Sequence, residues 1–199
     1  NTTLNKLHIV VSAIEHKAIL ETARFLEREG VKVTYVAPTK EGLVTTEAIE
    51  EALTDQTVLV SVMYVNNEVG SVQPVTQIGR LVEKTRSARE EQGGRGSGGK
   101  GGCGGKGLPI YFHTDAVQAV QFLECRLDYL KADALTASAH KIYGPKGVGS
   151  LVVRDGVPLE PLIVGGGQES EKRSGTENVA GCVGFAKALE LVTELKTSS

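Results

Sequence analysis

The stretch ALTASAHKIYGPKGVGSLVV, residues 134–153, places two basic side chains between two short apolar runs. The runs Ala134–Ser138 and Gly149–Val153 have the length and composition of buried strands. His140, Lys141 and a turn rich in Gly and Pro lie between them. A strand that we expect to be buried on both faces therefore ends at a lysine. Burial would lower the pKa of that amine, and a Schiff-base lysine needs a partly neutral amine.

Similar apolar, β-branched runs alternate with helical patterns along the rest of the chain. This alternation predicts an α/β fold with a mostly parallel sheet flanked by helices. Ser12 and Glu15 are spaced as a capping box, which predicts that the first helix begins at Ser12 and ends near Gly30. The other strands are expected at Leu7–Ser12, Val31–Val36, Thr57–Met63 and Ile110–Thr114, and the other helices at Glu47–Leu53, Thr76–Glu91, after Asp115, and at Gly181–Leu195.

Length and charge narrow the classes of protein that the chain could represent. Its 199 residues are enough for one domain, spanning 1–199, and the net charge of −2 gives no basic excess for nucleic acid. There is no apolar run of the roughly 18 residues that a membrane span needs. Three widely spaced cysteines and four scattered histidines predict neither disulfides nor a metal site, and indicate a reduced, intracellular setting. The chain begins without Met, and we interpret it as the inside of a longer protein.

The segment 93–107 has an unusual composition, since ten of its fifteen residues are Gly. It cannot bury enough apolar surface to offset the entropy of ordering, so we expect a flexible surface insertion. It lacks the spacing of a phosphate-binding Gly loop. Cys103 would then be an exposed thiol, whereas Cys182, within an apolar helical pattern, is expected to be a core residue.

Polar side chains follow three of the predicted strands, where ligands bind in open α/β sheets. Asn66 and Asn67 follow one strand and would also suit a simple turn. Asp115 follows the next and would also suit a helix cap, with Gln118 about one helical turn further on. Lys141 follows a third strand. A lysine and an acid at neighbouring strand ends together favour pyridoxal phosphate (PLP), which needs a Schiff-base lysine and an acid on its ring nitrogen.

Five motifs, in order, carry a closer resemblance: EHKAIL, VNNEVG, HTDAVQA, SAHKIYGPKGVG and GGGQE…RSGTEN. Together they resemble the cysteine desulfurase family within the class V aminotransferase superfamily, with selenocysteine lyases as near relatives. The resemblance runs from about Leu7 to Leu195. It implies the large domain of a PLP-dependent transferase of fold type I.

The resemblance also implies a role for each matching residue. Lys141 would bind the cofactor covalently, and Asp115 would pair with its ring nitrogen. His16 would stack on the ring and shuttle protons, although it would also suit an ordinary helix start. The remaining contacts implied are Gln118 to the phenolic oxygen, Asn67 to the cofactor, Ser138 and His140 to the phosphate, and Thr176 to the phosphate of a partner subunit, hence a homodimer.

The implied activity is conversion of L-cysteine to L-alanine, with sulfur passed as a persulfide to an acceptor or iron–sulfur scaffold protein. The family's N-terminal phosphate loop, its catalytic cysteine loop and its C-terminal small domain have no counterpart here, so we expect a cofactor-binding fragment. A selenocysteine lyase, another class V enzyme or a non-catalytic subunit remain alternatives. The compartment, whether cytoplasm, mitochondrion or plastid, is left open.

Overall fold

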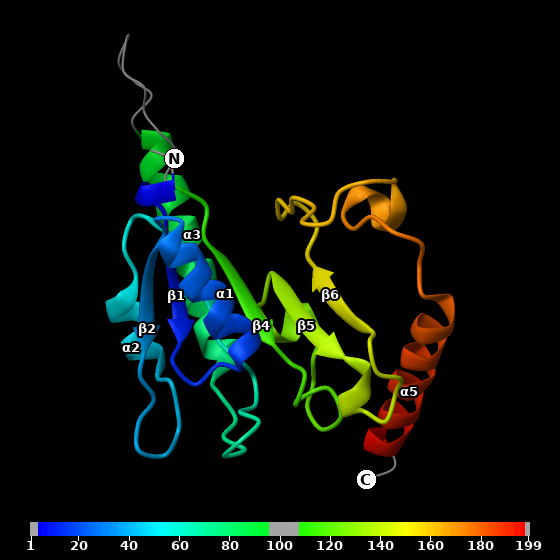
Figure 1. The fold of residues 1–199 in the computed structure, drawn as a ribbon. Coiled ribbons are helices and arrows are strands. Elements are labelled where there is room, and N and C mark those ends of the chain that lie inside the picture. The colour runs from blue at the N-terminus through cyan, green and yellow to red at the C-terminus, as the bar shows by residue number, and fades with distance from the viewer. Residues whose placement is uncertain (1–3, 96–107, 198–199) are drawn as a thin grey trace.

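The computed structural model describes residues 4–95 and 108–197 (Figure 1). One six-stranded sheet has the order β2-β1-β3-β4-β5-β6, with β1 to β5 parallel and β6 antiparallel to β5. All six predicted strands are confirmed within two residues at each end. They are β1 His8–Ser12, β2 Lys32–Val36, β3 Thr57–Ser61, β4 Tyr111–Asp115, β5 Ala134–Ser138 and β6 Gly149–Val153.

The helices connect the strands and cover both faces of the sheet. Most of the Gly-rich segment, residues 96–107, lies outside the described residues, and its first three residues are the end of α3 rather than a loop. The helices are α1 Lys17–Arg28, α2 Thr46–Ala52, α3 Val75–Arg95, α4 Leu127–Leu130 and α5 Val179–Thr197, with short 3-10 turns η1 Leu4–Lys6, η2 Ala139–Lys141 and η3 Gln168–Glu171.

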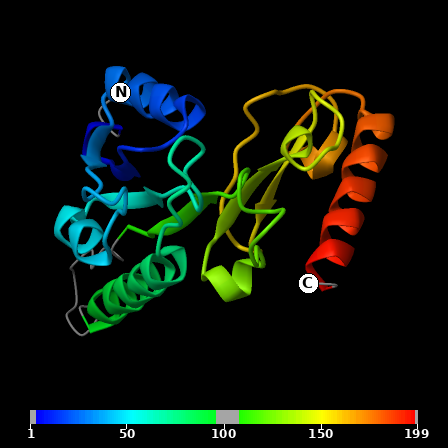
Figure 2. The ribbon, with the colours of Figure 1, turned by 90° about the horizontal axis from the view of Figure 1, so that it is seen from below.

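Alternating side chains of the central strands produce two apolar layers. Ile9 and Val11 of β1 pack with Ala23 of α1 on one face. Val10 of β1 and Val60 of β3 pack on the other face, in the larger cluster that α2 and α3 complete. Figure 2 shows α1 and α3 on opposite sides of the sheet, as expected for parallel strands covered on both faces.

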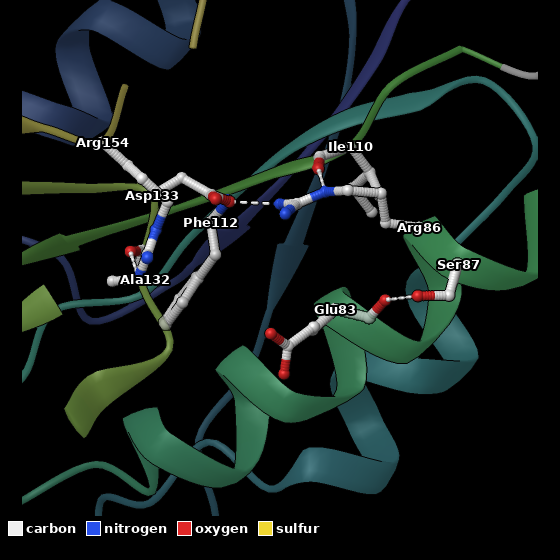
Figure 3. Close-up of polar contacts among 8 residues, drawn as sticks. All are labelled: Glu83, Arg86, Ser87, Ile110, Phe112, Ala132, Asp133 and Arg154. Atoms are coloured by element: carbon white, nitrogen blue, oxygen red, sulfur yellow. Dashed lines mark hydrogen bonds and ion pairs between the residues drawn. The ribbon is translucent and has the colours of Figure 1, made fainter. Parts of the chain in front are cut away.

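A buried ion pair ties α3 to the strands that carry the site (Figure 3). Arg86 of α3 pairs with Asp133, whose side chain is 4% exposed, and donates from Nε to the Ile110 carbonyl at 2.9 Å. The same Asp133 carboxylate accepts the Phe112 amide of β4 at 2.7 Å. These contacts lie at the start of β4 and β5, so they fix the direction in which both strands run toward their carboxyl ends.

The predicted start of the first helix is wrong. α1 begins at Lys17 and its N-cap is His16, which accepts the Ala18 amide on Nδ1. Glu15 does not close a capping box, because its carboxyl group accepts the amide of Met63 on another loop. Glu15 therefore makes a long-range hydrogen bond with Met63 in place of the local capping-box hydrogen bond that its spacing from Ser12 suggested.

Three further expectations are also wrong. No regular helix follows Asp115; the chain makes successive turns at 116–123, and α4 begins only at Leu127. Strand β5 is not buried on both faces, since Leu135 is its only buried residue, and its neighbour β6 is largely exposed. Cys182 is exposed on α5 rather than buried in the core.

No helix in the described ranges is long and apolar enough to cross a membrane.

Candidate functional site

Four loops of interest follow the carboxyl ends of β1, β3, β4 and β5. These strands are parallel neighbours, so their carboxyl ends lie at one edge of the sheet (Figure 1). The loops carry most of the residues singled out from the sequence: His16 after β1, Asn67 after β3, Asp115 and Gln118 after β4, and Ser138, His140 and Lys141 after β5.

Asp115 is the most firmly held of these residues. It is buried, its Oδ1 accepts the Val117 amide at 2.9 Å, and its backbone carbonyl accepts the Tyr64 amide at 2.8 Å. Burial raises the pKa of Asp115, against smaller opposing effects of the Val117 hydrogen bond and the nearby His16. Hydrogen bonds among the described residues engage only Oδ1 of this carboxyl group, which leaves Oδ2 for another donor.

The chemistry of Asp115 fits the ring nitrogen of PLP. An anion that is costly to bury gains from a cationic N–H partner, and Oδ2 provides the acceptor. Gln118 is half-buried on the turn that follows, close enough in sequence to serve the same ligand. Oδ1 of Asp115 also caps that turn by accepting the Val117 amide. Capping therefore accounts for Oδ1 of the carboxyl group but not for Oδ2.

The loop after β5 is a single tight turn that presents Lys141. Ile142 is buried beneath it, and its amide and that of Gly144 both bond the Ala139 carbonyl, at 3.0 and 2.9 Å. A Cβ atom at Gly144 would lie 2.9 Å from the Ala139 backbone, so only glycine fits at this position of the turn. Lys141 itself is exposed, and the burial from which we expected a lowered amine pKa is not found in the described chain.

Ser138 and His140 form a polar pair beside Lys141. The Ser138 hydroxyl and His140 Nδ1 lie 2.7 Å apart, and His140 is exposed. Their mutual hydrogen bond uses one of the pair's donors and leaves at least one other, the Ser138 O–H or the His140 Nε2–H, for an anionic oxygen such as that of a phosphate.

His16 and Asn67 lie on the two other loops of this edge. Both are exposed, and the Asn67 side chain makes no hydrogen bond within the described part of the chain. His16 is a helix start, as one of our two interpretations held, and its Nδ1 is used by the Ala18 amide. Its other ring nitrogen, Nε2, is left for a ligand.

Thr176 does not join this group within the chain. It is exposed in the connection from η3 to α5. In Figure 1, η3 lies at the end of the sheet opposite to the carboxyl ends of the parallel strands, and the connection runs outside β6.

Two buried residues of this edge, Glu15 and Asn66, make contacts that the sequence patterns did not predict. Glu15 is buried and reaches Met63, and Asn66 is buried and bonds the Ile14 carbonyl at 2.8 Å. The paired asparagines of VNNEVG were the available signal for Asn66, because a turn rarely needs both side chains.

Cysteine and histidine side chains elsewhere have structural environments. Cys125 is half-buried, and burial raises its pKa to about 11, which keeps it as an unreactive thiol. His8 bonds Thr57 and Thr34 inside the sheet, as expected for a structural residue. Cys103 lies outside the described residues.

Similarity to known proteins agrees with this arrangement. The structure of a NifS-like protein is 41% identical with a TM-score of 0.83, covering 96% of this chain and 47% of that one. The structure titled SspA in complex with cysteine is 39% identical with a TM-score of 0.79, covering 92% and 47%. The sheet and these likenesses place the chain in the class of PLP-dependent transferases of fold type I.

The family follows from the sequence matches. The family model Aminotransferase class-V matches residues 1–88 and 106–199, so the chain belongs to the class V aminotransferase family. Cysteine desulfurase IscS of Clostridium botulinum strain Hall is 47% identical over 187 residues, which are 94% of this chain and 41% of that protein. Cysteine desulfurase IscS of Methanosarcina thermophila is 42% identical over 186 residues, 94% and 40% of the two chains. The resemblance to cysteine desulfurases is thereby confirmed, and the chain spans less than half the length of these relatives.

Proposed function

We propose that this chain is the cofactor-binding part of a cysteine desulfurase that converts L-cysteine to L-alanine. The observation that carries the proposal is the edge formed by the ends of β4 and β5, where Asp115 offers a free carboxylate oxygen and Lys141 follows on the neighbouring strand. The relative from Clostridium botulinum is named a cysteine desulfurase, and the structural neighbour SspA, whose fold is similar, is titled as a complex with cysteine.

Different residues of the site would bind different parts of PLP. Lys141 would bind its aldehyde covalently, Asp115 would receive the ring N–H on Oδ2, and Ser138 and His140 would bind phosphate oxygens. Bound there, PLP supplies an electron sink for the bonds to the substrate Cα. Asp115 serves that sink by keeping the ring nitrogen protonated.

Three other side chains complete the proposed site. His16 would lie against the ring with Nε2–H as its available donor, because Nδ1 accepts the Ala18 amide, and a proton shuttle through His16 would require that hydrogen bond to open. Asn67 and Gln118 would bind polar groups at the ring edge. Thr176 would reach the phosphate of a second subunit. The connection from η3 to α5, which contains Thr176, lies away from this edge in Figure 1, and this favours such a role across a homodimer over one within a single subunit.

Sulfur transfer requires a cysteine thiolate that attacks the substrate sulfur, which becomes a persulfide while the carbon skeleton leaves as alanine. Among the described cysteines, burial raises the pKa of the half-buried Cys125 and keeps it protonated despite the nearby Lys196, and Cys182 is exposed on α5. We propose that this cysteine, and the acceptor or iron–sulfur scaffold protein that takes the sulfur, meet the site from the half of the relatives' length that this chain does not span.

The test is product analysis with the longer polypeptide that contains this chain, loaded with PLP and supplied with L-cysteine. Equal amounts of alanine and protein-bound persulfide are the expected result. Pyruvate and ammonia in place of alanine, or no turnover by protein that holds its cofactor, would contradict the proposal. The matched control is Lys146→Ala, an exposed lysine on the same loop, which should keep full activity while Lys141→Ala loses it.

A further inference from the structure

Glu15 is a buried carboxyl group that the proposed chemistry does not use. Its residue is 5% exposed, Oε1 accepts the Met63 amide, and Oε2 is buried without a hydrogen-bond partner among the described residues. A carboxylate in such a position is costly unless it carries a proton. Glu15 also precedes His16 directly, so whatever holds Glu15 also holds the start of α1.

Asn66 makes a second connection between the same two loops. Its Nδ2 donates to the Ile14 carbonyl at 2.8 Å, and its Oδ1 accepts the amides of Glu68 and Val69, both at 2.9 Å. The Asn66 side chain therefore stabilises its own loop through Oδ1 and bonds the loop after β1 through Nδ2. Asn67 follows it directly in the sequence.

We propose that Glu15 and Asn66 form a clasp between the loop after β1 and the loop after β3. The clasp positions the two candidate cofactor contacts on these loops, His16 and Asn67. Glu15 and Asn66 are thus positioning residues. Their own contacts stand without a cofactor, whereas the purpose of the clasp rests on the proposed function.

The protonation state of Glu15 is compatible with the nearby acid of the site. Burial raises the pKa of Glu15 to about 8; the Met63 hydrogen bond lowers it, Asp115 raises it further, and the Ser12 hydroxyl lowers it slightly. Near neutral pH, Glu15 therefore holds the clasp largely as a neutral acid. It can then lie near Asp115 without a second negative charge that would oppose the anionic form of Asp115.

The geometry explains why a hydrophobic side chain would not suffice at this position. The Met63 amide lies at the end of β3, just before Tyr64, whose own amide bonds the Asp115 carbonyl. Glu15 therefore extends a line of contacts from Asp115 through the loop after β3 to the loop that carries His16. Packing alone would bring the loops together but would not set their register.

The first experiment measures the clasp in the cofactor-free protein. Hydrogen exchange of the longer polypeptide would be compared for wild type, Glu15→Ala, Glu15→Gln and a control, Glu29→Ala, which removes an exposed carboxylate beyond the far end of α1. Glu15→Ala should speed exchange in peptides around Met63 at least about fivefold, the ratio that corresponds to one ordinary hydrogen bond. Glu15→Gln, which resembles the neutral acid and keeps an acceptor, should stay near the wild-type rate.

The second experiment tests positioning with the cofactor bound. Visible circular dichroism reports the orientation of bound PLP, so Glu15→Ala should change the cofactor band and Glu15→Gln should restore it. Asn66→Asp tests the clasp independently of Glu15, because it keeps the acceptor for the Glu68 and Val69 amides but loses the donor to the Ile14 carbonyl. It should alter the same band even if Glu15→Ala does not fold.

Unchanged exchange around Met63 in Glu15→Ala would overturn the clasp. So would a Gln variant as defective as the Ala variant, since charge rather than hydrogen bonding would then matter. A clasp that is confirmed by exchange, in a polypeptide that shows no cofactor band at all, would instead contradict the proposed function and leave the contacts of Glu15 in place.

Discussion

Replacing Asp115 with Asn should have opposite effects on the cofactor-free protein and on cofactor binding. Asn keeps an oxygen for the Val117 amide and removes a buried negative charge. Burial raises the pKa of Asp115, so the folded protein binds this proton more tightly than the unfolded chain does. Stability from this group is therefore complete at low pH and falls as the pH rises through the folded pKa. Cofactor-free Asp115→Asn should be at least as stable as wild type at pH 7, and its advantage should shrink in acid.

The same substitution should weaken the binding of PLP. A hydrogen bond to a charged group contributes about 1.5–3 kcal/mol. Its loss predicts a dissociation constant for PLP roughly 10- to 150-fold higher. The assays are thermal unfolding of the cofactor-free polypeptide at a series of pH values from 8 down to the ordinary pKa of an aspartate, and titration with PLP followed by absorbance. If Asp115→Asn bound PLP as tightly as wild type, Asp115 would be a turn cap and the reasoning would be refuted.

Two further predictions concern the framework of the site. Asp133→Ala should lower the free energy of unfolding by about 2–4 kcal/mol in chemical denaturation, because it leaves Arg86 and the Phe112 amide without their buried acceptor. Asp128→Ala, which removes an exposed ion pair, should cost less than about 1 kcal/mol, and equal losses would contradict this account. Burial lowers the pKa of His113 to about 4, so its contribution to stability should be complete above pH 6.5 and lost as the pH falls toward 4. His113→Gln should flatten the stability profile in that window, and an unchanged profile would show that other groups cause the slope.

The strands could be predicted from the sequence because each is a short apolar run bounded by turn residues. Their mostly parallel direction was predictable as well, since helices alternate with the strands, whereas no pattern in the sequence predicted their order in the sheet. The edge that carries Asp115 and Lys141 was predictable for the same reason: both residues come directly after such runs.

The errors arose where contacts between distant segments decide the outcome. Glu15 has the spacing of a capping residue but bonds Met63, 48 positions away. The burial of β5 depends on what covers it, and the first three helices lie elsewhere along the sheet: α1 and α2 contact β2, and α3 contacts β4. Motif resemblance assigned a role to Thr176, but its location beside η3 depends on the path of a connection that no local pattern specifies.

The position of the covalent bond to PLP tests the central claim most directly. The longer polypeptide would be incubated with PLP, reduced with borohydride and digested, and the modified lysine identified by mass spectrometry. The proposed site predicts a single label on Lys141, with the Lys146→Ala variant labelled as wild type and the Lys141→Ala variant unlabelled. Label on Lys146 or other exposed lysines, with Lys141 unmodified, would contradict it.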